Sequence, residues 1–250
     1  MELALIPPLA YRQDSAMTRM QLVLPRLYMD YKLYAEMYQA HAGNGCFIIL
    51  DNGAAENEQV TDYELSTVAQ ELMPDEVAIP DVLGDAKATI NRAQNFIEEY
   101  LEKYTMIGVA PGFVAQGCDV LETLDTIWEA YDRWNGIVKT IYIPRRLIND
   151  TGNKTARIEV MQNNLPDCFE YHFFGATGLF PDELRVAATL PNLRSMDTSL
   201  PYNYAWFNQP IDFTDMNISR PNDYFHLLFN SEQREYSIQN IQTMLRWINE

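Results

Sequence analysis

The chain has 250 residues and a formal net charge of −17, and hydrophobic residues make up 47% of it. This length is typical of one (β/α)8 barrel or of two small domains, and the apolar content excludes a disordered chain. The negative charge argues against non-specific nucleic-acid binding driven by phosphate neutralisation. A local basic patch remains compatible with it, because Arg145, Arg146, Lys154 and Arg157 lie close together in sequence.

The cysteines exclude the commonest zinc patterns. Cys46, Cys118 and Cys168 lie far apart, and no CxxC pair is present. We therefore predict no metal and no other cofactor. Dispersed cysteines fit a reduced compartment, so a cytoplasmic location is expected. The first residues, MELALIPPLAYRQD, lack the regions of a signal peptide, and no segment has the composition of a membrane span.

Short apolar runs that are typical of buried strands recur along the chain at fairly even spacing. In chain order they are Leu3–Ile6, Gln21–Leu24, Cys46–Leu50, Glu76–Pro80, Met106–Ala110, Val138–Ile143, Tyr171–Gly175 and Leu193–Met196. Their apolar character is continuous rather than alternating, which indicates parallel strands that are covered on both faces.

Amphipathic stretches typical of helices lie between most of these runs. They are Asp30–His41, Thr61–Met73, Asp85–Tyr104, Asp119–Trp134, Lys154–Asn164, Pro181–Thr189 and, at the end, Ser231–Glu250. Thr61 and Glu64 have the spacing of a capping box, and Asp85 is placed to cap the helix that follows it. The segment Pro7–Met20 is too polar and short to predict a helix, and Pro201–Asp223 is expected to be irregular.

Eight strands alternating with helices predict a parallel sheet of the α/β class. At this length such a sheet closes most simply into a TIM-type (β/α)8 barrel. No internal repeat, low-complexity segment or linker interrupts the pattern, so we expect residues 1–250 to form one barrel domain. In such a barrel the catalytic residues lie where the strands end.

Three carboxylates follow predicted strands: Asp51 in LDNG, Asp81 in IPDVLGD and Asp197 in SMDTSLP. Each also has an ordinary structural explanation. Asp51 fits an Asp-Asn-Gly turn, and Asp81 fits a helix N-cap or an ordinary loop acid. Asp197 can pair with Arg194 or with another nearby arginine. Three acids in one layer would perturb one another's pKa and cost stability, which favours a catalytic use.

Small residues near two strand ends can let a ligand approach the backbone. Gly112 lies in the segment GVAPG, and Gly175 and Ala176 begin the small-residue loop GATG. His172 lies within a predicted strand, where a histidine is more often a satisfied core residue than a catalyst. No GxGxxG, Walker A, HExxH or GxSxG motif is present, which disfavours dinucleotide, nucleoside-triphosphate and zinc-protease functions.

The segments around these acids resemble the tRNA-guanine transglycosylase superfamily, and most of all its short phage and bacterial relatives that insert 7-deazaguanines into DNA. The resemblance covers roughly Phe47 to Pro201. LDNGAAE is similar to the family's DSGGF segment, and IPDVLGD to the segment whose Asp grips the purine. The stretch YHFFGATGLFPDELRVAATLPNLRSMDTSLP resembles a Gly-rich strand end, a helix, and an Asp with Leu-Pro three and four residues on.

The resemblance implies a base-exchange glycosyltransferase that replaces guanine in DNA, or alternatively in tRNA, with a 7-deazaguanine base such as a preQ-type precursor. It places the nucleophile on Asp197, the acid that assists base exchange on Asp51, and the purine-binding carboxylate on Asp81. The rest of the implied substrate site consists of neighbouring small or amide residues: Asn52, Gly53, Gly112, Gly175 and Ala176. Nucleic-acid contacts are assigned to two adjacent cations, Arg145 and Arg146.

Two departures from the family pattern bear on this interpretation. The family carries Gln in the strand-end segment matched here by GVAPG, where this chain has Pro111, so the amide is lost or comes from a residue such as Gln116. The tRNA enzymes hold zinc with three cysteines and a histidine after the nucleophile, whereas no cysteine follows Cys168 here. The DNA-type relatives therefore fit the size of the chain better.

Two other functions stay open at the level of sequence. One is a nucleoside or base hydrolase that uses the same carboxylates with water. The other is a non-catalytic binding protein on a decayed barrel, which the lost Gln and the charge of −17 favour and the retained Asp51 and Asp197 disfavour. The sequence leaves open the deazapurine, the nucleic-acid context, any partner protein and the oligomeric state, a homodimer included.

Overall fold

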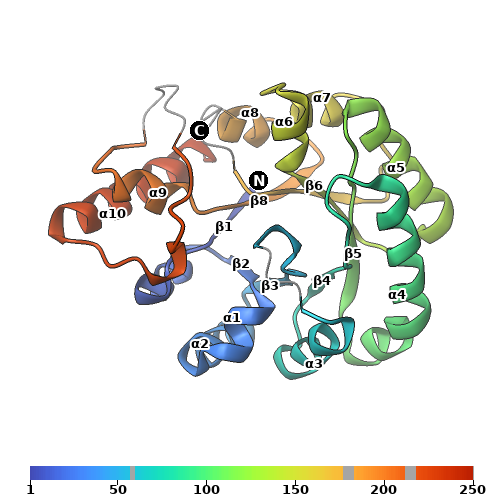
Figure 1. The fold of residues 1–250 in the computed structure, drawn as a ribbon, viewed down its shortest axis with the longest axis horizontal. Coiled ribbons are helices and arrows are strands. Elements are labelled where there is room, and N and C mark those ends of the chain that lie inside the picture. The colour runs from blue at the N-terminus through green and yellow to red at the C-terminus, as the bar shows by residue number, and fades with distance from the viewer. Residues whose placement is uncertain (57–59, 177–182, 212–217, 250) are drawn as a thin grey trace.

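Eight parallel strands form a closed barrel in the computed structural model of the chain, which describes residues 1–56, 60–176, 183–211 and 218–249 (Figure 1). The strands are β1 Glu2–Leu5, β2 Met20–Val23, β3 Phe47–Leu50, β4 Glu76–Ala78, β5 Ala110–Val114, β6 Thr140–Pro144, β7 Glu170–Phe174 and β8 Leu193–Thr198. The prediction of a (β/α)8 barrel is therefore confirmed.

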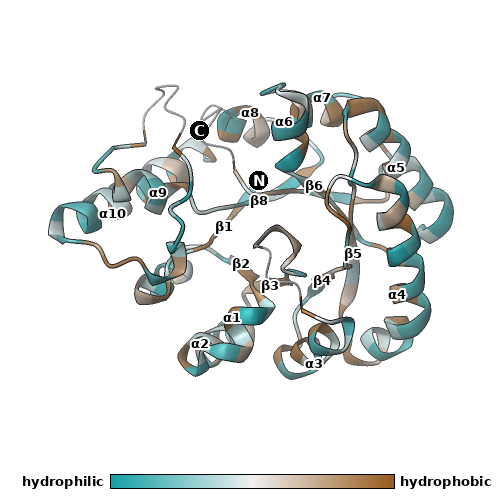
Figure 2. Cartoon of the chain, viewed as in Figure 1, coloured by the Kyte–Doolittle hydropathy of each residue, from teal (hydrophilic) through white to brown (hydrophobic). Residues whose placement is uncertain are grey.

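Pairing of the first strand with the last closes the barrel. Ala4 of β1 lies opposite Asp197 of β8, and the backbone N–H of Ile6 donates to the carbonyl of Thr198 at 2.9 Å. Closure leaves no unpaired sheet edge, and it brings the C-terminal ends of all the strands around one opening. Figure 2 shows hydrophobic residues along strands such as β1 and β2 and hydrophilic residues on the outer turns of helices such as α4.

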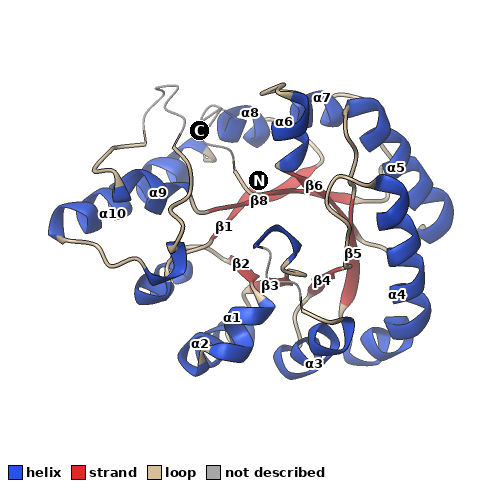
Figure 3. Cartoon of the chain, viewed as in Figure 1, coloured by secondary structure: helices blue, strands red, loops and turns tan. Residues whose placement is uncertain are grey.

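Helices surround the barrel on its outside (Figure 3). They are α1 Pro25–Asp30, α2 Lys32–Gly43, α3 Asp62–Leu72, α4 Ala86–Ile107, α5 Val120–Trp134, α6 Arg146–Thr151, α7 Ala156–Met161, α8 Glu183–Ala188, α9 Leu200–Trp206 and α10 Ser231–Trp247. The capping box of Thr61 and Glu64 is present, and the Asp85 side chain accepts a hydrogen bond from the Ala88 N–H at 2.8 Å. Both helix starts are as predicted.

Several connections differ in helix content from the sequence prediction, and the connection after β6 carries α6, which the sequence did not predict. The segment Pro7–Met20 contains a 3-10 helix, Leu9–Met17. The stretch predicted as one helix from Asp30 is divided at Tyr31, whose extended backbone separates α1 from α2. The segment expected to be irregular begins with α9. Of the predicted helix 181–189, residues 181 and 182 lie outside the described residues.

The fifth strand begins later than the sequence predicted. Met106 and Ile107 belong to the last turn of α4, which ends at Gly108 with a φ of 75°. Helix continues this far because the buried residues of α4 keep helical spacing as far as Tyr104, and glycine readily adopts the left-handed conformation that ends it. The strand itself starts at Ala110.

This shift changes which residues stand at the end of β5. Pro111 and Gly112 lie inside the strand, which ends at Val114. Just past this end, Gln116 lines the cavity at the opening of the barrel. A Cβ on Gly112 would overlap Cε2 of Tyr142. The structure therefore places Gly112 against a tyrosine ring of the barrel interior rather than in the ligand-facing position expected for it.

A buried ion pair lies inside the barrel near the N-terminal ends of the strands. The two carboxylate oxygens of Glu76 each accept a hydrogen bond from Arg194 at 2.7 Å. Thr140 and Tyr142 donate to the same carboxylate at 2.6 and 2.9 Å. Burial opposes ionisation of Glu76, but the hydrogen bonds and charge of Arg194 outweigh it and lower the pKa of this carboxyl. Glu76 is thus a satisfied, charged residue of the barrel interior.

Substituting Gly112 by Ala should destabilise the barrel by about 1–3 kcal/mol, the usual effect of overpacking. The ring of Tyr142 is fully buried, bonded to Glu76 and stacked on Phe174 with centroids 4.3 Å apart, so it has little room to move aside. Urea denaturation measures the loss. The matched control is Gly43→Ala, where a Cβ meets nothing within 4 Å; equal stability of the two variants would contradict the assigned packing.

Candidate active site at the barrel mouth

A cavity of about 210 Å³ opens at the C-terminal end of the barrel strands. Each of the eight strands contributes a residue at its end or close behind it. Of the residues predicted for the site, the cavity brings together Asp51, Asn52, Asp81, Arg145, Arg146, Gly175, Ala176 and Asp197. Gly112 and Gly53 are not among its lining residues. Gly53 has a φ of 77° and turns the chain directly after Asn52 in the sequence.

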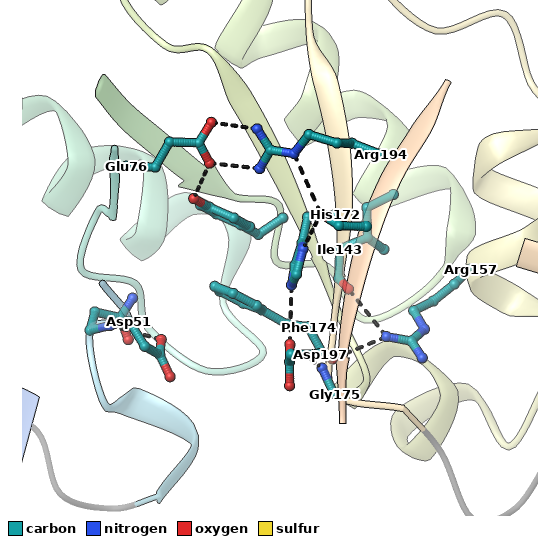
Figure 4. A network of polar contacts seen from close by, with 12 residues as sticks. Asp51, Glu76, Ile143, Arg157, His172, Phe174, Gly175, Arg194 and Asp197 are labelled. Atoms are coloured by element: carbon teal, nitrogen blue, oxygen red, sulfur yellow. Dashed lines mark hydrogen bonds and ion pairs between the residues drawn. The ribbon is translucent and has the colours of Figure 1, made fainter. Parts of the chain in front are cut away.

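Asp197 is held by two donors at the end of β8. Its Oδ1 accepts a hydrogen bond from the backbone N–H of Gly175 at 2.8 Å and lies 3.1 Å from Nε2 of His172 (Figure 4). Gly175 has a φ of 70°, a conformation that favours glycine at the turn after β7. The alternative pairing of Asp197 with Arg194 is not formed, since Arg194 binds Glu76 and Glu170 instead.

A fully buried salt bridge between Arg157 and Glu183 supports the turn after β7. Arg157 donates to Glu183 at 2.9 Å through Nε and at 2.5 Å through Nη2. Its Nη1 donates to the carbonyl of Phe174, the residue before Gly175, at 3.0 Å. Arg157 is therefore part of the scaffold and does not belong to the basic surface patch that its place in the sequence suggested.

His172 connects Asp197 to the barrel interior. It is fully buried, its ring meets those of Tyr142 and Phe174 edge-on, and its Nδ1 lies 2.7 Å from Oγ of Ser195. Ser195 in turn accepts a hydrogen bond from Nε of Arg194 at 3.4 Å. The carboxylate of Asp197 accepts, which assigns the ring proton to Nε2. In the neutral ring Nδ1 is then an acceptor, so the hydroxyl of Ser195 donates to it.

Burial also decides the charge of His172. It lowers the pKa of the imidazole, although the hydrogen bond and charge of Asp197 act in the opposite direction. The ring is therefore a neutral donor at neutral pH. Sequence reasoning identified His172 as a core histidine, and the structure shows a core histidine that also touches the candidate nucleophile. The sequence does not give the register of β7 on β8, which pairs His172 with Ser195 and so brings the ring close to Asp197.

A second polar group surrounds Asp81, on the loops that follow β3, β4 and β5. Asn52 donates through Nδ2 to Oδ1 of Asp81 and to the carbonyl of Ile79, both at 2.9 Å. Gln116 donates through Nε2 to Oδ2 of Asp81 at 2.5 Å and accepts from the N–H of Gly84 at 3.1 Å. Each amide is thus anchored to backbone on one side and holds one carboxylate oxygen on the other.

The environment of Asp81 differs from that of Asp197. Asp81 is 3% exposed, and burial raises its pKa although the hydrogen bonds from Gln116 and Asn52 favour the ionised form. Asp51 lies on the neighbouring loop, where its Oδ1 accepts from the N–H of Asn52 at 2.7 Å. The cavity therefore holds carboxylates in two distinct settings, one beside a histidine and one between amides.

Gln116 was expected only as a substitute for a missing amide. Because β5 ends at Val114, Gln116 occupies the strand-end position that the sequence analysis had given to Pro111. The misplaced strand caused this error, and the apolar run GFVA followed by Gln is the signal that could have corrected it.

Cations line the rim of the cavity. Arg145 and Arg146, the predicted nucleic-acid contacts, are exposed there, and Arg146 pairs with Asp150 at 2.8 Å. Arg220 also lines the cavity, from a segment in which the sequence suggested no site residue. The strongly acidic chain thus gathers arginines at one place beside its carboxylates.

No group of three or more His, Cys, Asp or Glu side chains that could bind a metal occurs within the described ranges. Cys46, Cys118 and Cys168 are free cysteines. The absence of zinc stays a prediction. Among the helices in the described part of the chain, none has the length and apolar character needed to cross a membrane.

Comparison with known proteins identifies the architecture only. No protein-family model matches the chain, and no curated protein matches it. A crystal structure of D-psicose 3-epimerase in the presence of D-fructose is similar, with a TM-score of 0.51 and 8% sequence identity over 79% of this chain and 84% of that one. At this identity the similarity shows a shared TIM-barrel fold and nothing about activity.

The lowered pKa of His172 predicts a pH-dependent stability. Above about pH 6.5, the ordinary histidine value, the ring is neutral in both the folded and the unfolded chain. As the pH falls below that value the unfolded chain binds the proton first, so the free energy of unfolding decreases. Urea denaturation between pH 7.5 and 5 should show a flatter profile for His172→Gln than for the wild type.

The comparison isolates one histidine because His41, whose pKa burial also lowers, is present in both proteins. A uniform loss of stability in the variant leaves the slope unaffected. Identical slopes for the two proteins would show that His172 takes up a proton as readily in the folded chain as in the unfolded one.

Proposed function

We propose that this chain is a pentosyltransferase that exchanges guanine in a polynucleotide, DNA in the first place, for a 7-deazaguanine base. The observation that carries the proposal is that Asp197, Asp51 and Asp81 line one cavity at the barrel mouth. These are the three acids whose segments resemble the guanine transglycosylases. Gln116 at the end of β5 supports the resemblance further, because it removes the departure inferred from Pro111.

Asp197 is the nucleophile in this proposal. Its carboxylate attacks C1′ of the target nucleotide, a C1′–O bond forms, and the C1′–N9 bond breaks through an oxocarbenium-like state. The N–H groups of Gly175 and His172 hold Oδ1, so the orientation of the carboxylate is set before the reaction. A neutral histidine donor stabilises the ionised carboxylate without neutralising it, which suits a nucleophile.

Asp51 is the acid and base of the exchange. It supplies the proton that the departing guanine takes up, and it then receives the proton that the incoming 7-deazaguanine loses when that base attacks C1′ and releases Asp197. Such proton transfer contributes about 10²–10⁴-fold to a rate. Asp51 follows β3 and Asp197 ends β8, and both line the same cavity, so the two carboxylates can serve different steps on one nucleotide.

Asp81 recognises the base. A carboxylate has about four acceptor positions, of which the amides of Asn52 and Gln116 use two. The remaining positions can accept the N–H edge of a guanine-like base. The two amides prevent Asp81 from rotating, so the direction of its acceptors is fixed when the base arrives.

A polynucleotide substrate requires the target base to leave the stack and enter the barrel mouth. Arg145, Arg146 and Arg220 at the rim can hold the phosphates of such an extruded nucleotide. The proposal keeps the cytoplasmic location that the dispersed cysteines led us to expect. The location of Gln116 removes one of the two arguments for the non-catalytic alternative, and the hydrolase alternative becomes an outcome of the following experiment.

The proposed nucleophile predicts a covalent intermediate. Wild-type protein mixed with a guanine-containing oligodeoxynucleotide, without an incoming base, should form an adduct that survives denaturing electrophoresis. Asp197→Asn should form none, because a neutral amide is a poor nucleophile. Asp125→Asn, on the exposed side of α5, is the matched control and should behave like the wild type.

The other outcomes of this experiment separate the alternatives. Release of free guanine without incorporation of a supplied base would indicate the hydrolase. Neither adduct nor exchange on DNA or tRNA would support a binding protein. Exchange by Asp197→Asn at the wild-type rate would contradict the covalent mechanism.

Base recognition predicts a loss of affinity in Asp81→Ala. Removing the carboxylate should weaken binding of a 7-deazaguanine base by about 1.5–3 kcal/mol, the range for losing a charged hydrogen-bond partner. Isothermal titration calorimetry measures it. Asp85→Ala is the control from the same loop, since Asp85 caps α4 and does not line the cavity. Unchanged affinity in Asp81→Ala would remove this residue from the base site.

A further inference from the structure

A second cavity, of about 420 Å³, lies beside the candidate active site. The end of α1 with Tyr31 forms one wall, and the segment 220–226 forms another. Ala55 and Arg220 line both cavities, so the two adjoin. The steps assigned to the three carboxylates make no use of this second cavity, which we call the flanking groove.

The walls of the flanking groove combine cations, carboxylates and aromatic rings. Arg26 is half-buried in the wall, and Asp30 and Asp223 contribute carboxylates. Tyr31 is 36% exposed, and its hydroxyl lies 3.3 Å from Nε2 of His226. This lining offers hydrogen-bond donors, acceptors and ring faces together.

Arg220 is fixed at the boundary between the two cavities. Its guanidinium lies over the ring of Tyr224 at 4.4 Å and over that of Phe225 at 4.6 Å. Tyr224 is buried and its hydroxyl donates to the carbonyl of Ile6, at the end of β1. A guanidinium held by ring stacking in this way is a preorganised phosphate ligand.

We propose that the flanking groove binds the nucleotide next to the one whose base is exchanged. The proposal rests on the proposed function. The phosphate would lie on Arg220 and Arg26, and the base would stack on the ring of Tyr31. The carboxylates of Asp30 and Asp223 accept hydrogen bonds from base N–H groups.

The mixed charge of the groove favours a nucleotide over simpler ligands. A bare phosphate would meet Asp30 and Asp223 as well as the two arginines, and an apolar ligand would place uncharged surface against these four charged side chains. A nucleotide has one anionic group, several neutral N–H donors and a flat ring, which corresponds to the three kinds of group in the walls. The adjoining position makes it the neighbour of the extruded nucleotide on the same strand.

The test measures base exchange on single-stranded oligodeoxynucleotides that contain one guanine. Arg26→Ala and Tyr31→Ala should each raise KM for the oligonucleotide about tenfold and leave kcat little changed, the size expected for losing one base-stacking or phosphate contact. Tyr31→Phe keeps the ring and should resemble the wild type. Lys32→Ala is the matched control, since Lys32 follows Tyr31 but points to Glu36 on α2 and is not part of the groove.

A second set of substrates replaces the base on the 5′ or the 3′ side of the guanine by an abasic site. On one of the two sides the abasic site should weaken wild-type binding about tenfold, and on that substrate Tyr31→Ala should cause no further loss. Fluorescence anisotropy with the same oligonucleotides measures the affinity independently of catalysis.

The outcomes distinguish this inference from the proposed function. If the wild type exchanges bases while Arg26→Ala and Tyr31→Ala behave like Lys32→Ala, the groove proposal is overturned and the function stands. If the wild type catalyses no exchange, the function fails, and the anisotropy of the same variants decides on the groove. Additive losses for Tyr31→Ala and the abasic site on both sides would show that the ring does not contact a neighbouring base.

Discussion

The hydrogen bond between His172 and Asp197 is the contact on which the candidate site depends most. It is the last step of a buried series that starts at the Glu76–Arg194 ion pair and passes through Ser195. Asp197 accepts from Nε2, so Nδ1 of the neutral ring accepts from Ser195, whose oxygen also accepts from Arg194. A buried ion pair is weak as a source of stability, so its clearer effect here is to hold Arg194 beside Ser195.

The barrel provides its carboxylates with different surroundings although they line one cavity. Asp197 accepts from a neutral histidine and a backbone N–H, whereas Asp81 lies between two amides where burial raises its pKa. Environments that separate the behaviour of carboxylates are the usual way in which one site supports distinct acid, base and nucleophile roles. Amides hold Asp81 without contributing charge, which suits recognition of a base rather than attack on a sugar.

Much of the fold could be predicted because buried parallel strands carry continuous apolar runs and helices begin at capping residues such as Thr61 and Asp85. The three acids were found for a related reason, since each directly follows or ends such a run. The fifth strand was misplaced because the apolar residues Met106 and Ile107 fit both a helix end and a strand start. Because this strand was misplaced, Gln116 was not recognised as the residue at its end.

Other site residues could not be predicted, because they depend on contacts between segments distant in sequence. His172 looks like a core residue until the register of β7 on β8 is known. Arg220 belongs to a segment without apolar periodicity, and only its stacking on Tyr224 and Phe225 brings it to the mouth. Local patterns determine where a strand ends, whereas the pairing of side chains across strands is a property of the closed barrel.

For the proposed function, the charge of −17 and the rim arginines have to be considered together. The field of so acidic a chain repels a duplex lying against its outer surface, so long-range attraction does not bring the substrate in. Electrostatic attraction of a phosphate is confined to the barrel mouth, where the cavity is lined by Arg145, Arg146 and Arg220. Such an arrangement favours a nucleotide that is already unpaired, because only an extruded base with its own phosphates reaches the arginines without bringing the remaining duplex close to the acidic surface. In this proposal the free energy of unpairing and unstacking the target base selects among substrates. This free energy is lowest for single-stranded or weakly stacked sites.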